Sequence, residues 1–337
     1  MRRALSRREL LLEVTGIAAS AWAPARSVLA AATPIPIKIA SASGGLTLTM
    51  GALMRQQRFY ESFGLAPEVL AVADGTRILG GVVSGSVDAS MMSGFGQVFP
   101  AIERGATIKI LGGGALLPTV ALFSAKPSVR TLQDLQGKTI GTGSIGALIY
   151  QLTVCLLQKY QVDPSTMRFV NIGSSADVFR AVAAGTVDAG VAEAALIDNA
   201  ADYGVHLIDH GNMSIELPGY TFQGAWALER KIATARDALV RALAAHARLY
   251  RFVQSPESKE AFVQARRSLF PHARESEHIA QWNYIQTYKP FAVDLVLSPE
   301  RLRYMQQLNV SFKVQKQVLD FDRVADMSLA RDAVKLL

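Results

Sequence analysis

The sequence has 337 residues, half of them hydrophobic and 19% charged, and a formal net charge of +7. This length allows two domains, and this composition is that of a globular protein with a buried core. The single cysteine, Cys155, excludes intramolecular disulfides and cysteine-based metal sites, and no run of Lys and Arg indicates a nucleic-acid-binding surface.

Residues 1–32 are predicted to be an export signal. Ser6-Arg7-Arg8-Glu9-Leu10-Leu11 resembles the twin-arginine export motif, and a moderately apolar stretch follows it to Ala23. Glu13 interrupts that stretch, which is too short and too polar to span a bilayer. Small residues around Ala30 suit a signal peptidase. We therefore expect a protein exported to the bacterial periplasm without stable membrane insertion; the alternative is an ordinary amphipathic first helix.

The segment from residue 35 to residue 111 alternates between strands and helices. Isoleucine at positions 35, 37 and 39 predicts a strand over 35–42, and apolar residues at helical spacing predict a helix over 46–63. Strands that alternate with helices indicate a parallel sheet with helices on both faces. The further strands expected in this first lobe are 67–72, 87–92 and 107–111.

One short phrase occurs twice, 100 residues apart, as Gly85-Ser86-Val87-Asp88-Ala89 and Gly185-Thr186-Val187-Asp188-Ala189. Each copy follows an apolar helical stretch, and glycine suits the left-handed residue that ends a helix. Val-Asp-Ala then begins a buried strand. We interpret the two aspartates as turn residues that bond to local backbone N–H groups; the alternative is a carboxylate pair. The repeat predicts two similar α/β lobes.

The second half of the chain repeats the pattern of the first. Strands are expected at 138–140, 167–172, 187–191 and 206–209, and the chain is mostly helical after a strand at 220–227. With no third lobe in this helical part, we place it against the first lobe. The predicted organisation is lobe one at 33–120 plus 224–337, lobe two at 125–219, and hinge crossings at 119–125 and 220–227.

A glycine loop in lobe two, Gly141-Thr142-Gly143-Ser144-Ile145-Gly146, matches the dinucleotide fingerprint. That fingerprint also needs an acidic residue where the next strand ends, but Gly173-Ser174-Ser175 stands there. We therefore expect no nucleotide cofactor. The loop instead offers backbone N–H groups at a helix N-terminus, which favours an anionic or strongly polar ligand group.

Small polar loops follow the strands of both lobes. Ligands bind outside the carboxyl ends of strands in open α/β sheets, so two such edges across a hinge predict a cleft that closes on a small molecule. None of the five histidines has metalloprotease spacing, and we expect no metal and no catalytic residue. The loops are 41–45, 73–76, 93–96, 141–146, 173–175 and 192–194.

From Ile37 onward the chain resembles the nitrate/sulfonate/taurine family of ABC-transporter substrate-binding proteins. Residues 132–141, Leu-Gln-Asp-Leu-Gln-Gly-Lys-Thr-Ile-Gly, match the family's "LxDLKGKxIG" motif, and both Gly-x-Val-Asp-Ala phrases match as well. Arg248-Leu249-Tyr250 with Ser255-Pro256-Glu257 resembles its late helix. The resemblance implies a two-lobed, type-II periplasmic-binding-protein fold of the α/β class. In it, two doubly wound sheets are joined by a two-strand hinge and the ligand lies in the interlobe cleft.

The resemblance also implies ligand contacts, carried over by position. Glu193 departs from the family, because many relatives have a small residue or proline nearby. An acid facing the cleft would disfavour a simple dianion and favour a cationic or hydrogen-bond-donating ligand. The implied contacts are Ser41, Ser43, Gly44, Gly45, Thr76, Ser93, Gly94, Ser144, Ile145, Gly146 and Glu193.

For four aromatic residues near these positions the sequence allows two roles, stacking on an aromatic ligand or packing in the core. They are Phe95, Phe99, Phe222 and Trp226.

The hypothesis that follows is a monomeric periplasmic binding protein, not an enzyme, without a cofactor. It would capture a small polar or anionic organic solute, such as a sulfonate, a taurine-like compound or an aromatic or pyrimidine compound, and deliver it to a permease powered by a separate ATPase. One alternative is an enzyme on the same fold, similar to thiamine-pyrimidine synthases or a menaquinone-pathway group. Those synthases carry a cysteine-rich iron motif that this sequence lacks. Another alternative is a ligand sensor that docks on a membrane receptor.

Overall fold

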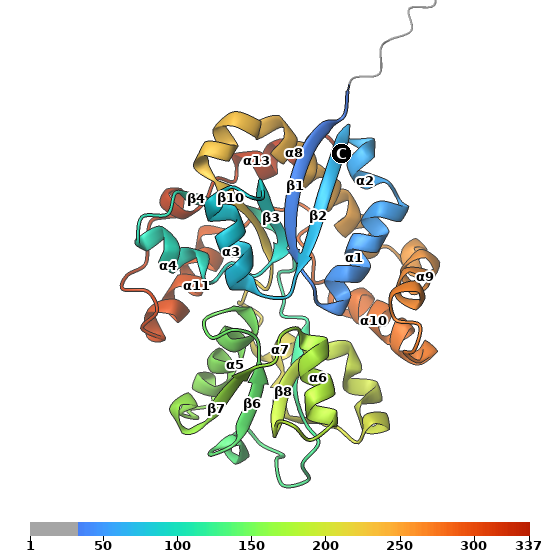
Figure 1. Ribbon diagram of the computed structural model, residues 1–337, viewed down its shortest axis with the longest axis vertical. Coiled ribbons are helices and arrows are strands. Elements are labelled where there is room, and N and C mark those ends of the chain that lie inside the picture. Colours follow the sequence, from blue (N-terminus) through green and yellow to red (C-terminus); the bar gives the residue numbers. More distant parts are fainter. Residues whose placement is uncertain (1–32) are drawn as a thin grey trace, which may run out of the picture. The chain divides into compact units, whose positions relative to one another are not determined.

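The computed structural model describes residues 33–337, and the predicted export signal lies outside them. Residues 34–337 form one compact unit that contains two five-stranded sheets (Figure 1). We call the sheet that contains β1 (Ile35–Ala42), with the helices packed against it, lobe one. The sheet that contains β6 (Thr139–Thr142), with its helices, is lobe two. Among residues 33–337, no helix is both long enough and apolar enough to cross a membrane.

The sheet of lobe one is mixed, although a parallel sheet was predicted. Strand β1 pairs in parallel with β2 and β3, whereas β10 runs antiparallel between β3 and β4. The antiparallel strand arrives from the second half of the chain, after the chain has left lobe two. The order is β2 (Leu65–Val72), β1 (Ile35–Ala42), β3 (Ala89–Ser93), β10 (Gly224–Leu228) and β4 (Ile108–Gly113).

The sheet of lobe two repeats this design. Strand β6 pairs in parallel with β7 and β8, and β5 runs antiparallel to β8 and β9. Here the antiparallel strand is the first one after the chain leaves lobe one. The order is β7 (Arg168–Asn171), β6 (Thr139–Thr142), β8 (Ala189–Glu193), β5 (Val120–Ser124) and β9 (His206–Asn212).

The chain passes between the two sheets over residues 114–119 and 213–223. The predicted crossing at 119–125 is corrected, because β5 pairs with β8 from Val120 onward and therefore belongs to the second sheet. The strand predicted over 220–227 begins only at Gly224. The short helix α7 (Met213–Glu216) lies within the second crossing.

The helix predicted over 46–63 is two helices, α1 (Gly45–Gln56) and α2 (Phe59–Ser62). Arg58 between them has a left-handed backbone with φ of 52°, which breaks the helical hydrogen-bond ladder. Two further helices of lobe one, α3 (Gly75–Ser84) and α4 (Val98–Glu103), follow β2 and β3.

The C-terminal part of the chain is helical, as predicted, and packs mainly on lobe one. Helix α8 lies against β1, β2, β4 and β10 and is kinked at Ala235, while α9 packs on α1. Helix α10 also touches the 3-10 segment η3 (Ala194–Tyr203) of lobe two, so it contacts both lobes. The helices are α8 (Glu229–Val253), α9 (Lys259–Leu269), α10 (Glu275–Tyr288), α11 (Pro299–Ser311), α12 (Phe321–Val324) and α13 (Ser328–Val334).

Both copies of the repeated phrase end a helix on a left-handed glycine, Gly85 with φ of 78° and Gly185 with φ of 70°. The aspartates do not bond to local backbone. Asp88 Oδ2 instead accepts a hydrogen bond from the backbone N–H of Lys38 at 2.8 Å, and Asp188 Oδ2 accepts one from Thr139 at 2.7 Å. Each aspartate therefore fixes the first parallel strand of its own lobe to the strand that follows the phrase.

We expect Asp188→Ala to lower the free energy of unfolding by about 1–2 kcal/mol, because the Thr139 N–H loses a charged acceptor. Lys126, which pairs with the same carboxylate, is half exposed and adds little. Urea denaturation followed by circular dichroism would measure the loss. Asp88→Ala tests the same contact in lobe one, and an unchanged midpoint in both variants would contradict the assigned role.

Candidate functional site

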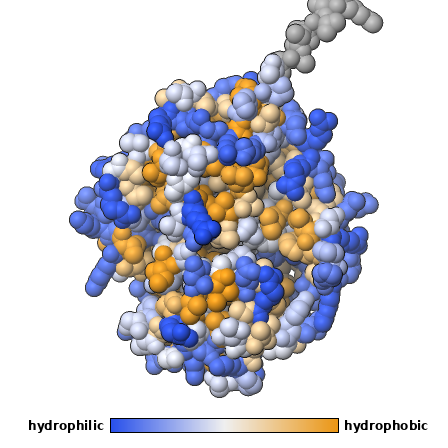
Figure 2. Space-filling view, in the orientation of Figure 1, coloured by the Kyte–Doolittle hydropathy of each residue, from blue (hydrophilic) through white to orange (hydrophobic). Residues whose placement is uncertain are grey.

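A cleft lies where the carboxyl ends of β1 and β3 in lobe one face those of β6 and β8 in lobe two. Its empty space is about 780 Å³, a figure that includes open solvent at the mouth. Figure 2 shows hydrophobic side chains at the surface of both lobes where they meet. The cleft thus lies at the strand ends where the sequence predicts a ligand site.

The lobe-one wall is built from the start of α1 and the end of β3. Ser43 and Thr47 flank the first turn of α1, and the Thr47 hydroxyl accepts a hydrogen bond from Gln223 Nε2 at 3.2 Å. The Ser93 hydroxyl accepts a hydrogen bond from the indole N–H of Trp226 at 3.2 Å. These bonds fix the orientation of hydroxyl groups that line the cleft.

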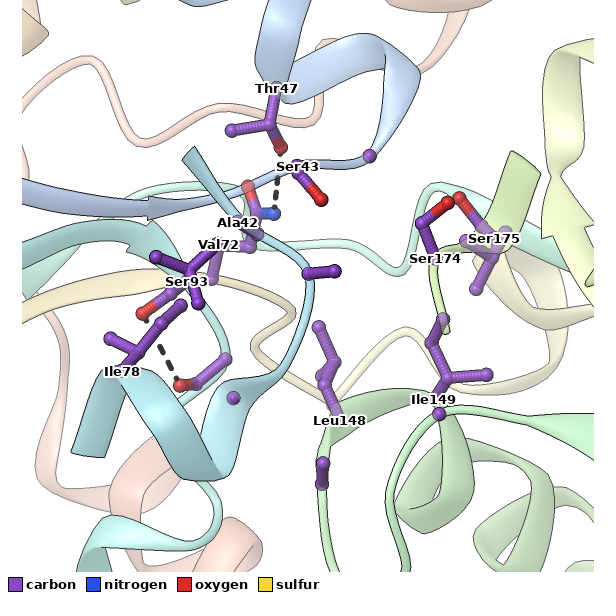
Figure 3. Close-up of a pocket in the computed structure, with 18 of the residues that line it drawn as sticks. Ala42, Ser43, Thr47, Val72, Ile78, Ser93, Leu148, Ile149, Ser174 and Ser175 are labelled. Carbon is purple, nitrogen blue, oxygen red and sulfur yellow. Dashed lines mark hydrogen bonds between the residues drawn. The ribbon is translucent and has the colours of Figure 1, made fainter. Parts of the chain in front are cut away.

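The lobe-two wall is built from the starts of α5 (Leu148–Lys159) and α6 (Ser175–Ala183). Figure 3 shows Leu148, Ile149, Ser174 and Ser175 across the cavity from Ser43 and Thr47. Ser174 is the N-cap of α6 and shares a capping box with Asp177. This wall therefore presents apolar surface from one helix and hydroxyl groups from the other.

One contact between the lobes joins Asp74 of lobe one to the Ser144 hydroxyl of lobe two. Asp74 is the N-cap of α3, and its other oxygen accepts hydrogen bonds from the backbone of Thr76 and Arg77. Partial burial acts to raise the pKa of Asp74. The hydrogen bonds from Ser144, Thr76 and Arg77 outweigh it and hold that pKa below its usual value. Asp74 is therefore an ionised link across the cleft at neutral pH.

A second contact between the lobes joins Glu193 to the start of α1. Glu193 stands at the end of β8, and its Oε1 accepts a hydrogen bond from the backbone N–H of Leu46 at 2.6 Å. Its Oε2 lies 3.7 Å from Nη1 of Arg266, a residue of α9. Glu193 therefore lines the cleft, and its carboxylate is engaged by protein groups on the opposite lobe.

Six of the eleven residues predicted to bind ligand line the cleft: Ser43, Gly44, Ser93, Gly94, Ser144 and Glu193. Whether they contact a ligand remains a prediction.

The other five lie next to the cleft without lining it. Ser41 is buried within β1, Gly45 is packed under Glu193, and Thr76 is exposed. Ile145 points away from the cavity, with 72% of its surface exposed, and Gly146 beside it turns the chain with φ of 81°. In each case the neighbouring residue of the same loop or helix takes the lining position.

Of the four aromatic residues, three lie in the core and one lines the cleft. Phe95, Phe99 and Trp226 are completely buried in the core, and the rings of Phe95 and Phe99 pack edge to face. Phe222 lines the cleft, in the segment that crosses from lobe two back to lobe one.

The apolar part of the lining was not predicted from the sequence. These side chains follow helical or strand periodicity, so they resembled ordinary core positions. Their position along the chain could have identified them as lining residues. Most of them lie in the first turn of a helix or at the last residue of a strand, beside a predicted polar loop. The missed apolar residues are Leu46, Val72, Ile78, Val120, Leu148 and Ile149, and the missed polar ones include Thr47, Gln97 and Gln223. Ser174 and Ser175, which also line the cleft, lie in the loop 173–175 that was expected there but were not among the predicted ligand contacts.

The His, Cys, Asp and Glu side chains, which commonly hold metals or act as nucleophiles, are dispersed or buried in the described part of the chain. Between residues 33 and 337, no three His, Cys, Asp or Glu side chains are grouped so as to hold a metal ion. Cys155 is buried in α5, and burial raises the pKa of its thiol. His246 is buried in α8, and none of the five histidines lines the cleft.

Comparison with known proteins identifies a family and a fold. The profile described as "NMT1/THI5 like" matches residues 50–248, more than half of the chain. The alkanesulfonate-binding protein of Xanthomonas axonopodis pv. citri, solved with MOPS, is 18% identical. It superposes with a TM-score of 0.69 over 90% of this chain and 98% of its own. No protein with a curated description is detectably similar in sequence.

Two other solved structures share the fold. The periplasmic nitrate-binding protein of Synechocystis is 11% identical, with a TM-score of 0.72 over 90% of this chain and 89% of its own. A desulfurization enzyme is 13% identical, with a TM-score of 0.61 over 90% of this chain and 99% of its own. The two-lobed α/β periplasmic-binding-protein fold predicted from the sequence is thus confirmed, and it is a fold that serves binding proteins and at least one enzyme.

Proposed function

We propose that this chain, which belongs to the NMT1/THI5-like family, is a solute-binding protein that captures a small organic molecule between its two lobes. The observation that carries the proposal is the cleft itself. Its walls come from both lobes, and two side chains, Asp74 and Glu193, bond across it. A ligand that touches both walls stabilises the closed arrangement and shifts the population toward it.

The composition of the lining supports an organic ligand over a simple ion. Leu148 and Ile149 offer apolar surface on one side, and Ser43, Thr47 and Ser93 offer hydroxyl groups on the other. Sulfonates, taurine-like compounds and aromatic or pyrimidine compounds all combine an apolar body with polar groups, and they form the starting set of candidate ligands.

The proposed setting is the periplasm, with delivery of the ligand to an ABC permease and its ATPase. This part rests on the family and on the export motif at Arg7-Arg8. We propose the twin-arginine route for export and a monomer as the working form. A receptor-docking sensor would use the same cleft, and genes for a permease and an ATPase beside this one would favour transport.

An enzyme on this fold is the second candidate, since one solved neighbour is a desulfurization enzyme. A pyrimidine-synthase-like or menaquinone-pathway-like activity would need a reacting group in the cleft. The one titratable side chain that lines the cleft in residues 33–337 is Glu193, which is bonded to the start of α1. We therefore propose binding without turnover. Chemical change in a candidate ligand, followed by mass spectrometry with pure protein, would overturn this choice.

We expect a thermal-shift screen of the candidate classes to find a stabilising ligand. At about 100 times its dissociation constant, a ligand stabilises the folded state by about 2.7 kcal/mol, a shift of several degrees. A variant with a blocked cleft, Gly94→Leu, is the matched control. A Cβ at Gly94 would lie 2.7 Å from the Leu148 Cβ across the cleft. A shift that persists in this variant would place the ligand outside the cleft, and no shift with any class would contradict capture of those solutes.

A further inference from the structure

We propose that Glu193 determines which ligand charge the cleft accepts. Its carboxylate occupies the position at the N-terminus of α1 where an anionic group of a ligand would otherwise bind. The cleft then accepts an uncharged ligand with an apolar body in preference to a sulfonate or a carboxylate. This inference rests on the proposed function, and it selects among the ligand classes named there.

The start of α1 lacks a cap from its own part of the chain. Its N-cap is Gly44, which has no side chain to accept a hydrogen bond, and the first turn contains no acidic residue. Such a helix end carries unpaired N–H groups and a partial positive charge, so it attracts an anion. Glu193 Oε1, 2.6 Å from the N–H of Leu46, supplies that anion from the other lobe.

Gly45 permits this close approach. A Cβ at Gly45 would lie 2.6 Å from Glu193 Oε1 and 3.2 Å from its carboxyl carbon. Any other residue would therefore push the carboxylate away from the helix. The missing side chain at Gly45 therefore leaves the space that the Glu193 carboxylate occupies.

Arg266 provides a second, independent indication that an anion is required here. Only 6% of this residue is exposed, and its Nε and Nη1 have no hydrogen-bond partner among residues 33–337. A buried guanidinium needs a nearby negative charge, and the Glu193 carboxylate at 3.7 Å provides it. The carboxylate thus lies between a helix N-terminus and a buried cation, and all three are parts of the protein.

The remainder of the lining carries no charge to balance an anionic ligand. Glu193 is the one charged residue among those that line the cleft in the described chain, and no Lys, Arg or His joins it. A sulfonate would have to give up its hydration shell beside hydroxyl groups, apolar side chains and a fixed carboxylate. An uncharged ligand avoids that cost and can accept or donate hydrogen bonds with Ser43, Thr47 and Gln97.

The test is titration of methanesulfonate, by calorimetry, into the wild-type protein and into Glu193→Ala. Removal of the carboxylate opens the N-terminus of α1 and leaves Arg266 without its counter-charge. We expect the variant to bind methanesulfonate at least about tenfold more tightly than the wild type. If Glu193→Ala does not fold, Glu193→Ser opens the same space, and the same gain is expected.

Asp163→Asn is the matched control. It also removes one negative charge from lobe two, but Asp163 is exposed and lies outside the cleft lining, and asparagine keeps the cap on the turn at 164–166. We expect its methanesulfonate affinity to stay within about threefold of wild type, a difference of about 0.7 kcal/mol. An equal gain in Asp163→Asn would show a general charge effect and overturn the proposal.

Three results with the wild-type protein separate this inference from the proposed function. Micromolar binding of methanesulfonate to the wild type would overturn the assignment of Glu193, while it would support solute capture as the function. Binding of uncharged compounds in the thermal-shift screen, with no response to anions, would support both. A wild type that binds nothing would contradict the proposed function, and the gain in Glu193→Ala would still test the role of the carboxylate.

Discussion

Replacing Trp226 by alanine is expected to lower the free energy of unfolding by about 3–5 kcal/mol. The side chain is fully buried in β10, the strand that lies between β3 and β4. Alanine would leave a cavity at the centre of the first sheet. It would also remove the indole N–H that donates to Ser93 Oγ at 3.2 Å. We therefore expect weaker ligand binding as well, since Ser93 lines the cleft.

Guanidinium denaturation followed by circular dichroism would measure the stability of this variant. Trp226→Phe is the control, because it retains most of the apolar volume and loses the hydrogen bond. We expect a cost of about 1–2 kcal/mol for it. If the alanine variant were as stable as the phenylalanine variant, Trp226 would not occupy the core position that the structure gives it.

The second large effect is a loss of stability in mild acid that comes from His246. This imidazole is buried in α8, with Nδ1 2.8 Å from the carbonyl oxygen of Ala242 and Nε2 3.4 Å from the Tyr60 hydroxyl. Burial lowers the pKa of His246 from 6.5 to about 4, although the hydrogen bond to Ala242 partly opposes the shift.

The direction of the pH effect follows from that shift. Above pH 6.5 the imidazole is neutral in both the folded and the unfolded chain, so the full stability is present. As the pH falls from 6.5 toward 4, the unfolded chain binds a proton that the folded protein does not, and stability decreases. The loss approaches about 3 kcal/mol near the lower limit of this window.

Denaturation curves at several pH values would measure this effect. His246→Gln, which does not titrate, is the comparison, and we expect its stability to change less across the same window. Equal slopes for the two proteins would show that His246 is not the group responsible. Burial acts to raise the pKa of Glu216, but hydrogen bonds from Lys159, Tyr160 and His210 lower it from 4.5 to about 2. Glu216 therefore also costs stability as the pH falls below 4.5, but both proteins share that loss, so the difference between their curves reports His246.

The lobes and their order could be predicted because the local signals agree with one another. Gly85 and Gly185 end helices, the strands after them are buried, and polar loops follow those strands. The places where the prediction failed lack such signals. Arg58 adopts a left-handed conformation without being glycine or asparagine, so nothing in the sequence marks the break between α1 and α2.

The cleft could be located from sequence, but its chemistry could not. Leu148 resembled a core residue because its helix is apolar on several faces, and only the position of lobe one shows which face is open. Glu193 resembled a free acid, since its partners Leu46 and Arg266 lie 147 and 73 residues away in the chain. Contacts between distant segments carry no local pattern, and they determine which groups a ligand can reach.

The position of β10 also has a consequence for the order in which the chain can fold. All five strands of lobe two lie within residues 120–212, so that sheet is complete once this segment is synthesised. The sheet of lobe one has β10 between β3 and β4, and residues 224–228 follow Gly113 by more than 100 positions. Until they arrive, β3 keeps an unpaired edge and β4 has no partner strand in its sheet. The segment synthesised first therefore completes its sheet last, and its closure requires contacts between residues far apart in the chain.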